Sequence, residues 1–319
     1  MLSLREVCCP LHQERLHHAQ GPEGPGEREL FHMIPDEQRA GYADALAKEW
    51  QTWCKYQAVA VLDTEDSAHV LAHVSPERIL ATRVCYRNKN AAIPWMPIKY
   101  KARIVCRGDR DPDLLTLRRD APTLARLSLM LICQLAASMV DWFMFNADIT
   151  GAFLQGDQSL ASRREPLYLR QPREGLPGLH RDQLMLIVRG IVGLANSPRL
   201  FWRHLRDSLL QLGFRQSMLD KALFLYYKNG QLILAIGVHV GDLIGTGKPG
   251  DADEILKKIR ETFDFGAWAD DREEKVLEYG GISRSHVKVV WSDFPRRSSS
   301  RLLLCLVCQS GGHRHQVQH

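Results

Sequence analysis

The sequence predicts a mixed α+β fold organised around an antiparallel sheet. Apolar residues at helical spacing and runs with strand-like alternation follow one another as helix, hairpin, helix, strand, helix, antiparallel strands and helix. Short turns join the strands between residues 222 and 247, and the pattern lacks the βαβ repetition of a doubly wound sheet. The composition, 45% apolar and 25% charged over 319 residues, is typical of a folded protein with a large core.

The first expected elements are a helix and a hairpin. Leu46, Trp50 and Trp53 recur at helical spacing in the stretch that starts at Gly41, which predicts a helix. Residues 79–108 then alternate and carry β-branched side chains, which predicts a hairpin of two strands.

A second helix and a strand are expected in the middle of the chain. The helix should begin behind Pro122 and bury one face formed by four leucines, Leu124, Leu127, Leu131 and Leu135. The strand includes the run "DWFMFNADITGAF" at 141–153. Because side chains alternate between the two faces of a strand, we expect Met144, Asn146 and Asp148 on one side.

The remaining elements complete the α+β pattern. Ser197 is expected to cap a helix over 197–213, with Pro198 at its first position and Gly213 at its end. The buried stripe of this helix should be Phe201, Leu205, Leu209 and Leu212. Strands follow, with an Asn229-Gly230 turn between the first two. A last helix over 251–263 should turn three residues inward, Ile255, Ile259 and Phe263.

Composition changes along the chain predict three segments. Residues 1–40 are rich in His, Gly, Pro and Glu and are expected to be poorly ordered, 41–290 should form the folded unit, and 291–319 should be a divergent, disordered tail. In that tail Cys305, Cys308 and His313 have the spacing of a zinc knuckle. Gln318 stands where the fourth ligand belongs, so we interpret the match as chance.

Charge and cysteine usage limit the possible environments. The eight cysteines are scattered, which favours reduced thiols in the cytoplasm or nucleus over secretion, and the longest apolar stretch is interrupted by polar residues, which excludes a membrane span. Residues 78–119 hold eleven Arg or Lys against three Asp. Such a patch is either a footprint of polyanion binding or a solvated surface.

Two carboxylates stand out by position. Asp148 ends the aromatic strand, and Asp242 lies at the presumed tip of a hairpin. Carboxylates at neighbouring strand ends can hold divalent metal ions, and two such ions can clamp the attacking and leaving oxygens of a phosphoryl transfer. Isolated aspartates are more often turn or cap residues, so position alone leaves both readings open.

Eight ordered blocks resemble the reverse transcriptase domain of Ty1/copia-type retrotransposon polyproteins. The resemblance extends from about Trp50 to Ile282. The blocks are "KARIVCRG" (101–108), "APTLAR" (121–126), "DITGAFLQGD" (148–157), "LYLRQPREG" (167–175), "GIVGLANSPRLFWRHL" (190–205), "LGFRQSMLDKALF" (212–224), "VHVGDLIGTG" (238–247) and "LEYGGI" (277–282). Any one block is weak evidence, but eight in order are specific, so the chain is identified as a member of this family.

The resemblance implies a right-hand polymerase fold of fingers and palm, with the thumb and RNase H absent or truncated in this fragment. It implies RNA-directed DNA synthesis on an RNA or DNA template–primer from deoxynucleoside triphosphates, using two Mg²⁺, with no membrane and no defined protein partner. By the same resemblance, Asp148 and Asp242 are metal-binding catalytic residues, and Phe153 is the ring that blocks a ribose 2′-hydroxyl. Lys101 and Arg103 lie on the strand that reaches the triphosphate, and the sequence leaves open which of the two makes the contact.

One position departs from the family pattern. Gly241 stands where the family has the first of two consecutive aspartates, and His239 replaces the usual tyrosine. Glycine offers no side-chain ligand, and imidazole is a poor ligand for Mg²⁺, so His239 is not expected to substitute. We therefore expect a polymerase with weak or no activity. The alternatives are a non-catalytic nucleic-acid-binding relic and the unfolded product of a decayed element.

Overall fold

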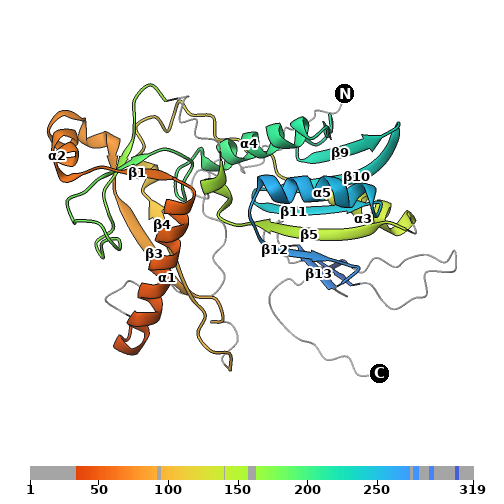
Figure 1. Ribbon diagram of the computed structural model, residues 1–319, viewed down its shortest axis with the longest axis horizontal. Coiled ribbons are helices and arrows are strands. Elements are labelled where there is room, and N and C mark those ends of the chain that lie inside the picture. The colour runs from red at the N-terminus through yellow and green to blue at the C-terminus, as the bar shows by residue number, and fades with distance from the viewer. Residues whose placement is uncertain are drawn as a thin grey trace, which may run out of the picture.

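The computed structural model describes residues 34–91, 95–139, 141–156 and 163–273, together with the backbone of three short strands at 276–279, 287–290 and 306–308. Figure 1 shows two parts. One contains a long helix beside a two-stranded hairpin and a small sheet, and the other is a larger sheet with helices on both faces. The expected α+β architecture with an antiparallel main sheet is confirmed.

The long helix α1 (Asp36–Lys55) packs along the hairpin formed by β3 (Thr82–Asn88) and β4 (Tyr100–Cys106). Its buried residues are Tyr42, Leu46, Trp50 and Trp53, which recur on one face of a helix. The predicted helix and hairpin are therefore confirmed. The helix begins at Asp36, so residues 36–40 belong to it and not to the segment expected to be poorly ordered.

A small sheet behind the hairpin was not predicted. It has the order β1 (Val59–Val61), β7 (Met185–Ile187), β6 (Tyr168–Leu169) and β2 (Ile79–Leu80), and helix α2 (Thr64–His73) follows β1. The side chain of Asp63 caps α2 by accepting a hydrogen bond from the backbone N–H of Asp66. Strands of two or three residues are too short to show the period-2 alternation on which strand prediction depends.

The main sheet has six strands in the order β12 (Phe265–Asp270), β5 (Phe143–Ile149), β11 (Asp242–Gly247), β10 (Gln231–His239), β9 (Leu223–Lys228) and β8 (Arg215–Gln216), and every pair is antiparallel. Helices α4 (Ser197–Gln211) and α5 (Asp251–Thr262) cover one face, against Phe143 and Phe145 of β5. Helix α3 (Arg126–Ser138) packs on the opposite face, against Met144. The predicted alternation along β5 is confirmed.

Two turns follow from their sequences. Asn229 and Gly230 both have positive φ, 53° and 78°, as the hairpin turn between β9 and β10 requires. Gly213 has φ of 93° and ends α4, where the N–H of Phe214 donates to the carbonyl of Leu209 and the N–H of Gly213 to that of Leu210. The predicted stop at Gly213 is confirmed.

The expected buried face of α3 is wrong in its middle, although Leu124 before the helix is buried and Leu135 is partly buried as expected. The helix starts at Arg126, and its buried residues are Ser128, Leu129, Ile132, Cys133 and Ala136. Leu127 and Leu131 of the expected stripe are 69% and 51% exposed. The helix is apolar almost all round, so spacing alone could not select the face. The sheet selects it at Gly237, where an added Cβ would meet Leu124 at 2.4 Å and Ile132 at 2.9 Å.

The expected cap of α4 is also wrong. Ser197 is the first helical residue, and its hydroxyl accepts a hydrogen bond from the N–H of Ile191 at 2.9 Å and donates to the carbonyl of Ile191 at 2.7 Å. Asn196 occupies the capping position, and Pro198 is second in the helix. Ser197 therefore holds the preceding loop against the helix.

Beyond the main sheet, β13 (Val276–Tyr279), β14 (Val287–Val290) and β15 (Leu306–Cys308) form a three-stranded antiparallel sheet. Three residues of the expected disordered tail thus form a strand. Cys305 and His313, whose zinc-knuckle spacing we interpret as chance, lie outside the described residues. Within the part of the chain that the structure describes, no helix has both the length and the apolar character needed to cross a membrane.

Candidate active site

Asp148 and Asp242 lie directly opposite each other on neighbouring strands. Asp148 is near the end of β5, Asp242 begins β11, and the two are paired residues of the antiparallel ladder. Directly opposed residues place their side chains on the same face, with Cβ atoms about 4.5–5.5 Å apart. Two carboxylates that are far apart in the sequence therefore face one site.

The turn before Asp242 contains only Val240 and Gly241, because His239 pairs directly with Asp242. Val240 has φ of 55°, a left-handed conformation that is strained for a β-branched residue. The carbonyl of Gly241 accepts a hydrogen bond from the N–H of Ile149 at 2.9 Å, which ties the turn to the end of β5. The turn is thus held tightly beside Asp148.

Position 241 faces the carboxylate of Asp148. A Cβ added to Gly241 would lie 3.9 Å from Oδ1 of Asp148, 3.5 Å from the carbonyl oxygen of Ile149 and 2.9 Å from Cβ of Ala152. A side chain here would enter the site, but glycine brings no ligand. Among the residues that the structure describes, no group of three or more His, Cys, Asp or Glu side chains could hold a metal ion. Two carboxylates suit one hydrated Mg²⁺.

The pKa values reflect a crowded, partly desolvated site. Burial raises the pKa of Asp242 to about 6, and the negative charge of Asp148 adds to this effect. Burial also raises the pKa of Asp148, while the positive charges of Arg103, Lys89 and Lys101 act in the opposite direction. The two carboxylates repel each other, so a cation between them would be stabilised.

His239 shares this face of the sheet through its pairing with Asp242. Burial lowers the pKa of its imidazole, and its buried Nδ1 has no hydrogen-bond partner among the described residues. His239 is therefore neutral at neutral pH. Its ring does not complete a metal-binding group with Asp148 and Asp242.

The β3–β4 hairpin directs a basic face toward these carboxylates. Along β4, Ala102 and Ile104 are buried, whereas Lys101 and Arg103 lie on the other face, and Arg87 of β3 pairs opposite Lys101. Nζ of Lys101 is 3.9 Å from Oε2 of Glu49 on α1. The structure therefore places Lys101 and Arg103 together on the predicted strand, and their charges act on Asp148.

Sequence reasoning did not single out Lys89 as a site residue. Burial lowers the pKa of Lys89, and the nearby charges of Lys101, Lys99 and Arg103 lower it further, while Asp148 acts in the opposite direction. Lys89 therefore lies within electrostatic reach of the same carboxylate as Lys101 and Arg103. Lys89 lies just past β3, and its N–H donates a hydrogen bond to the carbonyl of Lys99. The pairing of the two predicted strands could therefore have placed Lys89 beside the basic residues of β4.

Phe153 lies in a short 3-10 helix, η4 (Ala152–Gln155), that follows β5. Gly151 has φ of 56° and makes the turn between them. The ring is half-buried against the core beneath α4 and α5. The buried Gln155 side chain donates to the carbonyl of Thr150 at 2.6 Å and accepts from the N–H of Asp264 at 2.9 Å. These bonds fix η4, and with it Phe153, relative to the end of β5.

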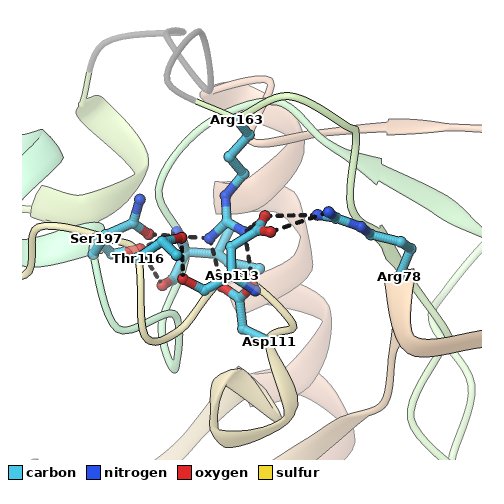
Figure 2. Close-up of polar contacts among 8 residues, drawn as sticks. Arg78, Asp111, Asp113, Thr116, Arg163 and Ser197 are labelled. Atoms are coloured by element: carbon cyan, nitrogen blue, oxygen red, sulfur yellow. Dashed lines mark hydrogen bonds and ion pairs between the residues drawn. The ribbon is translucent and has the colours of Figure 1, made fainter.

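A buried ion-pair network joins the loop after β4 to the segment before β6 (Figure 2). Arg163, whose side chain is 1% exposed, donates two hydrogen bonds to the fully buried Asp111, at 2.5 and 2.8 Å, and one to Asp113 at 3.1 Å. Arg78 donates two more to Asp113, at 2.6 and 3.0 Å. The sequence did not predict that these residues form ion pairs with one another. The network holds the base of the basic hairpin.

Replacing Asp242 with asparagine is expected to stabilise the metal-free protein at alkaline pH. The folded-state pKa of Asp242, about 6, lies above its ordinary value of 3.8. The free energy of unfolding is therefore highest below about pH 4, where Asp242 is protonated, and it declines as the pH rises through 6. The side chain of the Asp242→Asn variant does not ionise, so its free energy of unfolding should exceed that of the unaltered chain by about 1–3 kcal/mol at pH 8 and differ little at pH 4. Thermal melts with a chelator would measure it, with the exposed Asp44→Asn as control. An unchanged pH profile in Asp242→Asn would contradict the assignment.

The comparisons with known proteins agree on one family. A family model described as "Reverse transcriptase (RNA-dependent DNA polymerase)" matches residues 68–283. The chain is 29% identical over 161 residues to the retrovirus-related Pol polyprotein from transposon RE2 of Arabidopsis thaliana, covering 50% of this chain and 10% of that protein. It is 28% identical over 150 residues to the corresponding RE1 polyprotein of the same plant, covering 47% and 10%. The chain therefore spans about a tenth of the length of these relatives.

A solved structure of telomerase from Candida albicans, in complex with a fragment of telomeric RNA, is also similar, with a TM-score of 0.40 and 8% identity, covering 77% of this chain and 48% of that one. The family match itself covers most of the chain. The chain therefore belongs to the reverse transcriptase (RNA-dependent DNA polymerase) family. The polyprotein relatives confirm the expected Ty1/copia type.

Proposed function

We propose that the β3–β4 hairpin with α1 forms the fingers and the six-stranded sheet forms the palm of a polymerase. The chain binds a template–primer and an incoming deoxynucleoside triphosphate between them, and it catalyses RNA-directed DNA synthesis weakly or not at all. The observation that carries the proposal is the direct pairing of Asp148 and Asp242 across β5 and β11, within electrostatic reach of a basic hairpin face. Opposite charges on the two sides of one site suit a ligand that carries both phosphates and a metal ion.

Each site residue then has a physical role. Lys89, Lys101 and Arg103 neutralise the triphosphate. We assign both Lys101 and Arg103 to this role, although the sequence left open which of the two makes the contact. Phe153 limits the space beneath the sugar, so that hydrogen fits at the 2′ position and a hydroxyl does not. Asp148 and Asp242 would hold one Mg²⁺, which when bound supplies charge neutralisation for the phosphates.

Gly241 accounts for the expected weakness. Two metal ions need more carboxylate ligands than Asp148 and Asp242 provide, and the position that would supply a third faces the site without a side chain. The same observation favours a second candidate function, a non-catalytic nucleic-acid-binding relic, because the basic hairpin face is intact while the metal site is depleted. The two functions differ only in nucleotide incorporation.

Removing the two hairpin charges should weaken triphosphate binding. We expect Lys101→Ala/Arg103→Ala to raise the dissociation constant for dTTP about tenfold or more at low salt, because about 1.4 kcal/mol of charge-assisted contact corresponds to a factor of ten. Lys257→Ala/Lys258→Ala, which removes the same charge from exposed positions on α5, is the control. Calorimetric titration measures both. Equal binding by the two double variants would count against the site.

Incorporation assays separate the two candidate functions. Residual synthesis that Asp148→Ala abolishes, with template–primer binding retained, supports the polymerase. Binding with no incorporation in the unaltered chain supports the relic. Incorporation that survives Asp148→Ala would contradict the assignment of the site.

A further inference from the structure

The tip of the fingers hairpin carries three large apolar side chains in water. Trp95 is 86% exposed, Met96 is 44% exposed and Ile98 is 37% exposed. Single exposed apolar residues are common on protein surfaces, but three within four positions at one loop tip form a patch. An indole ring can bury about 150–250 Å² on contact with a partner, so Trp95 is a strong candidate contact residue.

The base of this tip is fixed by hydrogen bonds. Oδ1 of Asn88 accepts from the N–H of Asn90 at 2.9 Å and from the N–H of Lys99 at 3.0 Å, and Nδ2 of Asn90 donates to the carbonyl of Pro97 at 2.7 Å. The N–H of Lys89 also donates to the carbonyl of Lys99. Trp95 therefore extends from a defined neck, only a few residues from two lysines.

The charges around the tip select an anionic partner. Residues 79–107 contain seven Arg or Lys and no Asp or Glu. On the hairpin, Arg87 pairs with Lys101 in register, and Arg83 and Arg103 lie on the same face by alternation. This basic face leads from the tip toward Asp148, on which Lys89, Lys101 and Arg103 act electrostatically. The aromatic tip is thus continuous with the proposed triphosphate site.

An aromatic side chain beside a row of cations suits single-stranded nucleic acid. Unpaired bases stack on aromatic rings, and lysines neutralise the neighbouring phosphates. A membrane surface with anionic lipids offers a similar combination of charge and apolar surface. The continuity with the site at Asp148 favours nucleic acid, because a strand that enters that site must pass the hairpin.

We propose that Trp95 stacks on an unpaired base of the template strand ahead of the primer, while Lys99 contacts its phosphates. This inference rests on the proposed template–primer binding. It adds a contact that the interior of a duplex cannot make, since each internal base pair is stacked on both sides and exposes no face to the ring. Trp95 thereby favours a template with an overhang over a blunt end.

The test compares two DNA probes that share one duplex sequence, one blunt and one with a short 5′ template overhang. Fluorescence anisotropy with the full chain gives the affinity for each. We expect Trp95→Ala to weaken overhang binding about 5- to 150-fold and to leave blunt-duplex binding unchanged, whereas Trp95→Phe keeps most of the affinity. Leu219→Ala, at a side chain that is 100% exposed in the palm, is the matched control and should change neither. An overhang of abasic residues should reduce the unaltered chain to the level of Trp95→Ala.

Each other outcome overturns the inference. Equal losses on both probes, or none, would show that Trp95 does not contact an unpaired base. Loss of binding to phosphatidylserine vesicles in Trp95→Ala, with overhang binding unchanged, would assign the tip to a membrane. If the unaltered chain binds neither probe, the proposed function fails together with the inference, whereas normal duplex binding with an insensitive Trp95 removes the inference alone. Unchanged melting temperatures would confirm that the variants fold.

Discussion

Replacing Gly241 with aspartate is expected to raise Mg²⁺-dependent nucleotide incorporation by about 100-fold or more, the scale of a transition-state charge contact worth a few kcal/mol. The reason is geometric. A Cβ at this position would lie 3.9 Å from Oδ1 of Asp148, so a carboxylate attached to it enters the site between Asp148 and Asp242. Gly241 has no positive φ, so the backbone accepts the substitution without strain from that source. The contact of 2.9 Å with Cβ of Ala152 requires a small shift of the turn.

The same variant has a readout that does not depend on catalysis. A third carboxylate beside Asp148 and Asp242 increases their mutual repulsion, so the metal-free variant should be less stable than the unaltered chain at neutral pH. Mg²⁺ should reverse this, because a cation that binds only the folded state stabilises it by mass action. Thermal melts with and without Mg²⁺ measure the effect.

Gly241→Asn is the matched control, because asparagine has the same shape as aspartate but no charge. It should show neither the Mg²⁺-dependent stabilisation nor the gain in incorporation. Equal, robust synthesis by the unaltered chain and by Gly241→Asp would contradict the view that position 241 limits activity. Gains of equal size in Gly241→Asn and Gly241→Asp would attribute the effect to the turn and not to a metal ligand.

Local signals in the sequence predicted the elements that build the site. Alternation placed Met144 and Asp148 on one side of a strand, and Asn229-Gly230 and Gly213 marked a turn and a helix end. Only the family resemblance predicted that Asp148 and Asp242 lie close together, because no local pattern sets the register of two strands so far apart in the sequence. The structure supplies that register.

Features that depend on distant segments could not be predicted. The buried face of α3 is chosen by Gly237 on another element, because a helix that is apolar almost all round has no preferred side. Arg163 and Asp111 look like ordinary charged loop residues in the sequence, 52 positions apart, and only the folded chain brings them into contact. Lys89 is one of a run of basic residues in the sequence, and only the folded chain brings it within electrostatic reach of Asp148.

Replacing Arg163 with methionine is expected to lower the free energy of unfolding by about 3–5 kcal/mol, as removal of one partner from a buried ion pair does. The Asp111 side chain is fully buried, so without Arg163 its charge loses its main compensation inside the protein, whereas Asp113 keeps its two hydrogen bonds from Arg78. Methionine keeps much of the volume and apolar stem, which limits the loss from packing. Denaturant unfolding measures the change, and Arg164→Met, at the exposed neighbouring position, is the control.

A second substitution distinguishes charge from packing as the cause. If the cost comes from an uncompensated carboxylate, Arg163→Met/Asp111→Asn should recover part of the stability, because the amide needs no counter-charge. If the double variant is less stable than Arg163→Met, the cost comes from packing or from lost hydrogen bonds at Asp111. A loss below about 1 kcal/mol for Arg163→Met would mean that the network contributes no more than an exposed ion pair. Because Asp111 and Asp113 follow β4, a loss of the larger size would also loosen the base of the hairpin that holds Lys101 and Arg103 over Asp148, and triphosphate binding should weaken in parallel.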